Sequence, residues 1–384
     1  MIVLLHFFHL GYSPFILALL FLLYEFVGIF SNLTGGWLTS KFGIKRIILF
    51  GFSLQIIGIL SLSFVDNSWN LFLSLIWIIV FQGICGIAKD LTKTASKSAI
   101  KVSSETDSKG NLFKLVSWFT GSKNSIKGIG FFLGGFLIQL MDFKLALWFL
   151  LLLLLLGFII ISFFIPKTFG IFKPSKRITE LLSKSSPINF LSLSRVFMFG
   201  SRDIWFVVGL PVFLYSQNWS FWMVGSFLAI WTIGYGLIQG LTPLIINRSS
   251  DGISKEVMAS KFWVFILTII SGILFVELFF NFLNIEKLIL ITAFLIIFGI
   301  VFAINSSLHS YLILAFSSSS KTTEDIGFYY AANAVGRFFG TLLSGLLYQF
   351  GSIELCLFGT FIFLVVCLSF TMYLPNKLYT HLQS

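Results

Sequence analysis

The stretch that decides the fold is residues 145–165, LALWFLLLLLLLGFIIISFFI, which carries no charged side chain and a single hydroxyl at Ser162. An α-helix rises 1.5 Å per residue, so roughly 20 such residues cross the hydrocarbon core of a bilayer. A helix that is apolar on every side needs lipid or a large protein core around it. We therefore expect this segment to cross a membrane.

The rest of the chain carries the same signal. Hydrophobic residues make up 57% of the 384 residues and charged residues 11%, whereas a soluble domain typically has about 25% charged residues. This composition excludes a soluble protein and predicts an all-α membrane protein. Further apolar runs of spanning length lie at 15–35, 47–65, 70–88, 119–140, 188–215, 221–246, 260–280, 287–315, 327–350 and 354–374.

The chain begins with a shorter apolar segment, Met1–Leu10, which is about half a span long. It ends at the turn signal Gly11-Tyr12-Ser13-Pro14. We interpret it as the second half of a first helix whose beginning is absent from this chain. The expected total is therefore about 11.5 of 12 transmembrane helices.

The connecting loops alternate in charge. One set is rich in lysine and arginine, whereas the other set holds only Lys144 and Lys287 as cations. By the positive-inside rule, the basic loops and the C-terminus are expected on the cytoplasmic side of the cell's inner (plasma) membrane. This asymmetry accounts for most of the net charge of +11 without a nucleic acid partner.

A basic connector, Lys167–Lys184, lies between Pro166 and Pro187 and divides the chain. We expect an N-terminal helix bundle at 1–165, a cytoplasmic linker at 166–187 and a C-terminal helix bundle at 188–384. A short internal echo, Gly130–Gly135 against Gly336–Thr341, fits a duplicated six-helix unit, the arrangement of many secondary transporters.

Several charged residues fall inside the predicted spans. The cations outnumber the acids, Glu25 and Asp203. A charge at the bilayer centre costs roughly 2.5–3.5 kcal/mol even on the lenient insertion scale, so such residues indicate a function. An electropositive cavity favours an anionic substrate, and arginine suits phosphate or carboxylate because its fork donates two parallel hydrogen bonds. The cations are Lys123, Lys127, Arg195, Arg202 and Arg337.

Spacing selects the substrate-binding candidates. Arg195 and Arg202 are seven residues apart, hence on one helix face and about 10 Å apart along the axis. Lys123 and Lys127 are four apart and share a face. The alternative is that these four cations pair with acids or carbonyls and only fix helix packing.

Two acids are candidates for ion coupling. Asp203 directly follows Arg202 and therefore fits a fixed counter-ion, whereas Glu25 is the better candidate for a proton carrier.

A lysine stripe recurs every four residues at Lys89, Lys93, Lys97 and Lys101. We interpret it as a snorkelling face that contacts lipid headgroups. The alternative is an electrostatic funnel that draws anions toward the transport path.

The loop GWLTSKFGIKR at 36–46 resembles the signature loop of the major facilitator superfamily. The resemblance implies two six-helix bundles and alternating access. Ser40 stands where the family usually has an acidic residue. The expected gating-loop residues are Gly36, for close helix packing, Gly43, for the turn, and the cations Lys41, Lys45 and Arg46.

A narrower resemblance rests on six segments: Leu5–Pro14, Leu22–Phe26, Gly86–Leu91, Lys97–Lys101, Thr120–Asn124 and Gly200–Val208. Together they resemble the ArsJ-type organoarsenical efflux permeases over nearly the whole chain. This resemblance implies export of 1-arseno-3-phosphoglycerate, which a glyceraldehyde-3-phosphate dehydrogenase makes when it uses arsenate in place of phosphate. The expected role is arsenic resistance by efflux, with a functional link to that dehydrogenase. The alternative is an organophosphate/phosphate or drug:proton antiporter of the same superfamily.

An enzyme is not expected. The predicted spans hold no Asp-x-x-x-Asp, His-Glu-x-x-His or Gly-x-Ser-x-Gly array, so we expect no catalytic residues, metal or cofactor. No loop reaches the roughly 50 residues of a soluble domain, which excludes a separate nucleic-acid-binding or signalling module.

Overall fold

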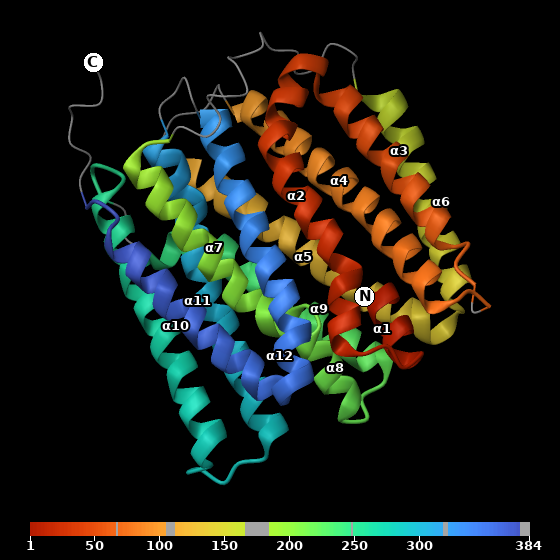
Figure 1. Cartoon of the computed structure of the whole chain (residues 1–384). Helices are drawn as coiled ribbons and strands as arrows, with labels where there is room; N and C mark the ends of the chain where they lie inside the picture. Colours follow the sequence, from red (N-terminus) through yellow and green to blue (C-terminus); the bar gives the residue numbers. More distant parts are fainter. Residues whose placement is uncertain (67, 105–111, 166–183, 247–248, 318–321, 377–384) are drawn as a thin grey trace.

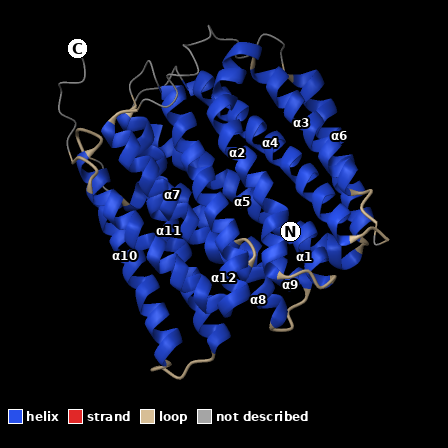
Figure 2. Cartoon of the chain, viewed as in Figure 1, coloured by secondary structure: helices blue, strands red, loops and turns tan. Residues whose placement is uncertain are grey.

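The computed structural model describes residues 1–66, 68–104, 112–165, 184–246, 249–317 and 322–376. These residues are helical apart from short connections, and no strand occurs among them (Figure 2). The helices are α1 (Ile2–His9), α2 (Pro14–Phe42), α3 (Ile44–Leu62), α4 (Leu71–Ser104), α5 (Leu112–Leu140), α6 (Phe143–Phe164), α7 (Ser186–Phe206), α8 (Gly209–Ser216), α9 (Phe221–Ile245), α10 (Ser254–Phe280), α11 (Lys287–Phe316) and α12 (Thr322–Met372).

The helices run up and down through one layered bundle (Figure 1). We call the end where α2 meets α3 and α10 begins the basic face, at the top of Figure 1, and the end where α2, α6 and α11 begin the opposite face. The two cations predicted for the opposite face form ion pairs there: Lys144 with Asp66 (3.1 Å) and Lys287 with Glu354.

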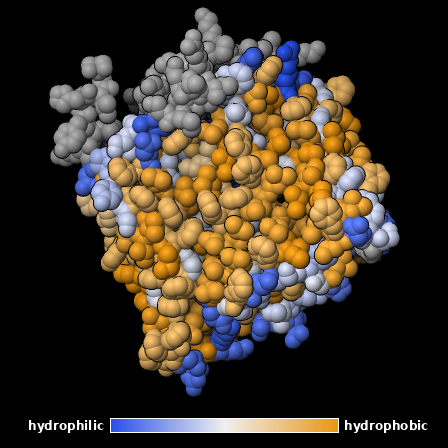
Figure 3. Space-filling view, in the orientation of Figure 1, coloured by the Kyte–Doolittle hydropathy of each residue, from blue (hydrophilic) through white to orange (hydrophobic). Residues whose placement is uncertain are grey.

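On the face shown in Figure 3, a broad apolar belt lies between two hydrophilic rims. Across the described residues, nine helical stretches are long and apolar enough to cross a membrane. One of them combines α7 and α8, and α12 makes two crossings in one stretch. The expected all-α membrane fold is confirmed. The division at residues 166–187 stays a prediction, because 166–183 lie outside the described residues.

Two breaks shape the second half of the chain. In α12 the backbone leaves the helical region at Gly351 and Ser352, between the two spans that the sequence predicts. The span expected at 188–215 is found as Ser186–Ser216, but the structure interrupts its helix at Val207 and Val208. A proline in a helix lacks an amide hydrogen, and its ring clashes with the carbonyl four residues earlier. For Pro211 that carbonyl belongs to Val207, which is where the helix breaks.

The amides freed by this break find another acceptor. The main-chain N–H groups of Val208 and Gly209 donate to the Ser344 hydroxyl oxygen of α12, at 3.1 and 3.0 Å. An unpaired backbone donor at membrane depth costs several kcal/mol, so this one hydroxyl makes the break tolerable.

Two helices are longer than the expected spans 70–88 and 119–140. The helix α4 continues to Ser104, and α5 begins at Leu112. The extension of α4, residues 89–104, is polar, and a hydropathy window cannot distinguish a helix that lines a polar cavity from a loop. Lys93 and Lys123 therefore lie inside helices, with regular structure on both sides of each.

Glycines set the contact between α5 and α9, which pack against each other along their length. A Cβ atom added at Gly236 would lie 2.5 Å from the carbonyl oxygen of Gly121, and one at Gly135 would lie 2.6 Å from that of Phe221. The helices α2 and α12 meet in the same way, since a Cβ at Gly345 would lie 2.5 Å from the Pro14 carbonyl. Both seams join segments that the sequence predicts in different bundles.

The α5–α9 seam predicts a difference between two glycines on one helix. Gly236→Ala places a methyl group against the backbone of α5, whereas Gly234→Ala meets nothing within 4 Å. We expect Gly236→Ala to lower the free energy of unfolding by about 1–3 kcal/mol through overpacking. Thermal unfolding in detergent would show this as a lower melting temperature for Gly236→Ala alone. Equal melting temperatures for the two variants would contradict the close approach.

Candidate functional site

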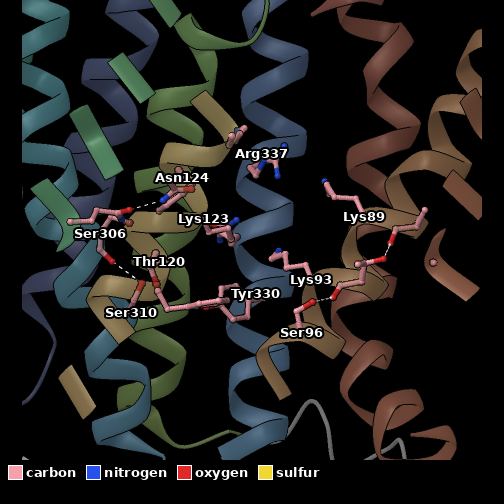
Figure 4. A pocket seen from close by; sticks show the side chains of 18 of the residues that line it. Lys89, Lys93, Ser96, Thr120, Lys123, Asn124, Ser306, Ser310, Tyr330 and Arg337 are labelled. Atoms are coloured by element: carbon pink, nitrogen blue, oxygen red, sulfur yellow. Dashed lines mark hydrogen bonds between the residues drawn. The ribbon is translucent and has the colours of Figure 1, made fainter. Parts of the chain in front are cut away.

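A cavity of about 620 Å³ lies among the helices (Figure 4). Its lining residues come from both predicted halves of the chain, including α4 and α5 on one side and α7, α9, α11 and α12 on the other. Among the described residues, no carboxylate lines it. Its cationic lining residues are Lys89, Lys93, Lys123, Lys127, Arg195, Arg202 and Arg337.

The four predicted substrate-binding cations, Lys123, Lys127, Arg195 and Arg202, therefore meet in one cavity. Lys123 and Lys127 form no ion pair within the described part of the chain. The ammonium of Lys127 lies 5.3 Å from the ring centroid of Phe131. Pairing with acids, one form of the packing alternative, therefore does not describe these two lysines.

Arg195 is held by neutral partners. Its Nε donates to Asn333 Oδ1 (3.0 Å), its Nη1 donates to Ser306 Oγ (3.3 Å), and its guanidinium stacks 3.7 Å from the centroid of Phe199. Arg195 is 4% exposed and has no carboxylate partner in the described ranges. The charge of this guanidinium is therefore oriented but not neutralised.

A polar wall supports Arg195 from three other helices. Tyr235 donates its hydroxyl to Ser306 (3.0 Å), and Gln239 Nε2 donates to Tyr235 (2.9 Å). Asn124 Nδ2 in turn donates to Gln239 Oε1 (2.5 Å). Hydrogen-bonded groups of this kind fix side-chain orientation and offer donors to a polar ligand.

Arg337 links the two predicted coupling residues. Its Nη2 donates to Glu25 on α2, and its Nε donates to Asp203 Oδ2 on α7 (3.3 Å). The other oxygen of Asp203 accepts from Arg202 Nε (2.7 Å). Glu25 is 4% exposed and Asp203 is 1% exposed. Both acids are thus counter-ions within one buried network that spans α2, α7 and α12.

The lysine stripe was expected to contact lipid headgroups, and for Lys89 and Lys93 this expectation is wrong. Both side chains line the cavity instead. Asp90 accompanies them, with its carboxylate 3.6 Å from the Lys89 ammonium and 3.2 Å from that of Lys93. Membrane helices that line a polar path bring such cations inward, away from lipid. The side chains of Lys97 and Lys101 lie outside the described residues.

The predicted gating loop lies on the basic face. Gly36 lies within α2, and Gly43 forms the turn with φ = +87°, which glycine adopts without strain. Lys45 donates to two main-chain carbonyls at the end of α6 (2.7 and 2.5 Å) and so ties α3 to α6. Lys41 lies 4.8 Å from the Trp37 ring centroid and is exposed, as is Arg46.

Sequence reasoning missed several lining residues as site residues. Arg337 had a usable signal, since an arginine inside an otherwise apolar span indicates a functional position. Asn333, Ser306, Tyr235 and Gln239 had none, because single polar residues of these types are common in membrane helices, where they hydrogen-bond to neighbouring helices.

Comparisons with known proteins agree with this geometry. The structure is similar to that of the human organic anion transporter MFSD10 (TETRAN), with a TM-score of 0.69 and 16% identity, over 93% of this chain and 84% of that one. It is also similar to a bacterial homologue of the iron transporter ferroportin in the outward-facing state, with a TM-score of 0.69 and 13% identity, over 94% of this chain and 91% of that one.

These two likenesses concern the fold alone. No curated protein matches the sequence. A sequence profile described as Major Facilitator Superfamily matches residues 1–318, which is most of the chain. The protein therefore belongs to the Major Facilitator Superfamily and is a secondary membrane transporter.

Proposed function

We propose that the protein exports an organic anion, 1-arseno-3-phosphoglycerate, by alternating access, and so confers arsenate resistance. In this proposal the basic face is cytoplasmic, the membrane is the inner (plasma) membrane, and a glyceraldehyde-3-phosphate dehydrogenase supplies the substrate. The observation that carries the proposal is one cavity lined by seven cationic side chains.

The charge balance supports an anionic substrate. Among the described residues these seven cations meet three carboxylates, those of Glu25, Asp90 and Asp203, and so outnumber them by four. Buried charges without partners are unfavourable in a low-dielectric interior, and a multiply charged anion would neutralise them. Phosphate and arsenate esters carry about two negative charges each near neutral pH.

The narrower assignment draws on where the resembling segments lie. Tyr24, Lys89, Lys123, Asn124 and Arg202 belong to four segments that resemble the organoarsenical efflux permeases, and all five line the cavity. Segments distant in the sequence thus supply one site. An organophosphate antiporter fits the same charges. A transporter of cationic drugs fits them poorly, because the cavity would repel its substrate.

The buried network suggests how substrate and proton are coupled. Arg337 donates to Glu25 and Asp203 at once. An anion that accepts a hydrogen bond from Arg337 competes with these carboxylates. Glu25 then loses its counter-ion and becomes the group that exchanges a proton, whereas Asp203 keeps Arg202.

The first prediction concerns Arg195. In everted membrane vesicles that contain the chain, arsenate, glyceraldehyde 3-phosphate, NAD and the dehydrogenase should together cause arsenic uptake, measured by mass spectrometry. Arg195→Gln should reduce the initial rate at least ten-fold, because it removes a charge-assisted hydrogen bond from the anion. Lys144→Gln on the opposite face is the matched control and should leave uptake unchanged.

Uptake that is equal with and without the dehydrogenase would refute the arsenical substrate. Absence of uptake, with the protein shown in the membrane by immunoblot, would do the same. Uptake of an organophosphate under those conditions would favour the second candidate. Uptake of lipophilic cations that Arg195→Gln leaves unchanged would oppose any anion transporter.

The second prediction separates the two acids. Glu25→Gln keeps the side-chain shape and removes the titratable group, so transport should lose its dependence on an imposed pH gradient. Asp203→Asn removes the carboxylate that Arg202 and Arg337 share, and breaking a buried pair destabilises by about 3–5 kcal/mol. Vesicle uptake with and without the gradient, together with melting temperatures, would distinguish these effects. A Glu25→Gln protein that keeps its full response to the gradient would exclude Glu25 as the coupling group.

A further inference from the structure

We propose that the cavity binds its anion end-on across two separate cationic layers. The inner layer, nearer the basic face, consists of Lys93, Lys123 and Arg195. The deep layer consists of Lys89, Lys127, Arg202 and Arg337. The fitting ligand carries two anionic groups joined by a short chain. This inference rests on the proposal that the substrate is an anion, and it assigns the residues that would bind each end.

Helix geometry separates the layers. Lys123 and Lys127 are one turn apart on α5, about 6 Å along the axis, and so are Lys89 and Lys93 on α4. Arg195 and Arg202 are about 10 Å apart along α7. Because α4 runs toward the basic face whereas α5 and α7 run away from it, Lys93, Lys123 and Arg195 are each nearer to the basic face than the deep-layer cation on the same helix.

The figure shows the same order. In Figure 4, Arg337 and Lys89 lie at one end of the labelled group, and Ser96 and Tyr330 lie at the other end. Lys93 and Lys123 lie between them, nearer to the basic face than Arg337 is. The cations are therefore stacked along the membrane normal rather than arranged in one ring.

Electrostatic neighbours agree with this grouping. The charged side chains that act most strongly on Lys127 are Arg337 and Arg202, both in the deep layer. Those that act most strongly on Lys123 are Lys93 and Arg195, both in the inner layer.

Each layer keeps about the charge of one phosphate-type group. The deep layer has four cations against Glu25 and Asp203. The inner layer has three cations against Asp90, whose nearest ammonium is that of Lys93. In each layer the cationic residues thus outnumber the described acids by two, and a phosphate ester carries about two negative charges.

The two layers differ in what an anion must displace. Arg202 and Arg337 already donate to carboxylates, so an anionic group in the deep layer competes with Glu25 and Asp203. Within the described ranges Arg195 has only neutral partners and Lys123 forms no ion pair, so an anion bound by these two inner-layer residues displaces no carboxylate. A ligand with a single anionic group therefore binds in the inner layer, and a second group adds the deep layer.

Two stable anions test this. Glycerol 3-phosphate and 3-phosphoglycerate share a phosphate end, and only the latter has a carboxylate at the other end. With the full chain in nanodiscs and binding measured by calorimetry, 3-phosphoglycerate should bind about ten-fold more tightly, the size of one charge-assisted interaction.

Lys123→Gln and Lys127→Gln form a matched pair on one helix. Lys123→Gln should weaken the binding of both anions about ten-fold, because both anions place their phosphate in the inner layer. Lys127→Gln should weaken the binding of 3-phosphoglycerate only, and Lys127→Arg should restore that affinity. Lys144→Gln should change neither affinity, and size-exclusion chromatography checks that each variant is folded.

If each lysine variant lost affinity equally for both anions, the two-layer site would be overturned and a single anion-binding centre indicated. Equal affinities of the two anions for the unmodified chain would overturn it as well. A chain that binds neither anion would overturn the proposed anion transport itself, which is a different outcome.

Discussion

The buried network around Arg337 is the interaction on which the rest of the structure depends. Three helices, α2, α7 and α12, each bring a charged residue to membrane depth, where an unpaired charge is costly. The cost is reduced because Arg337 donates hydrogen bonds to both Glu25 and Asp203, so that each of the three charges has a partner of opposite sign. Since α2 is distant in sequence from α7 and α12, the network also holds the two ends of the chain around one cavity.

That constraint explains why the surplus cations are acceptable. Arg195 has no acidic partner in the part of the chain that the structure describes, but it contacts Asn333, Ser306 and the face of Phe199. Stacking on aromatic faces and neutral hydrogen bonds fix a guanidinium without cancelling its charge. The positive potential of the cavity is therefore built into its walls before any ligand arrives.

Much of this was predictable from the sequence. Apolar runs and loop charge predicted the helices, and intramembrane charge identified Lys123, Lys127, Arg195 and Arg202 as residues that share a cavity. Which acid pairs with which cation was not predictable, because Glu25 and Arg337 are 312 positions apart and only the fold brings them together. The cavity positions of Lys89 and Lys93 were missed because helix periodicity alone does not tell which neighbour a polar face meets. The break before Pro211 was missed because its stabilising hydroxyl, Ser344, comes from α12.

The glycine seams have a mechanical consequence. Where Gly121 faces Gly236 and Gly135 faces Gly225, backbone meets backbone with few side chains between. Interlocked side chains must leave their rotamer wells before two helices can move past each other, whereas smooth backbone surfaces need no such step. The seams between α5 and α9 and between α2 and α12 thus offer little resistance to the sliding of one helix past the other. In the proposed alternating access, these seams would let one predicted bundle rotate against the other without a change of side-chain rotamers.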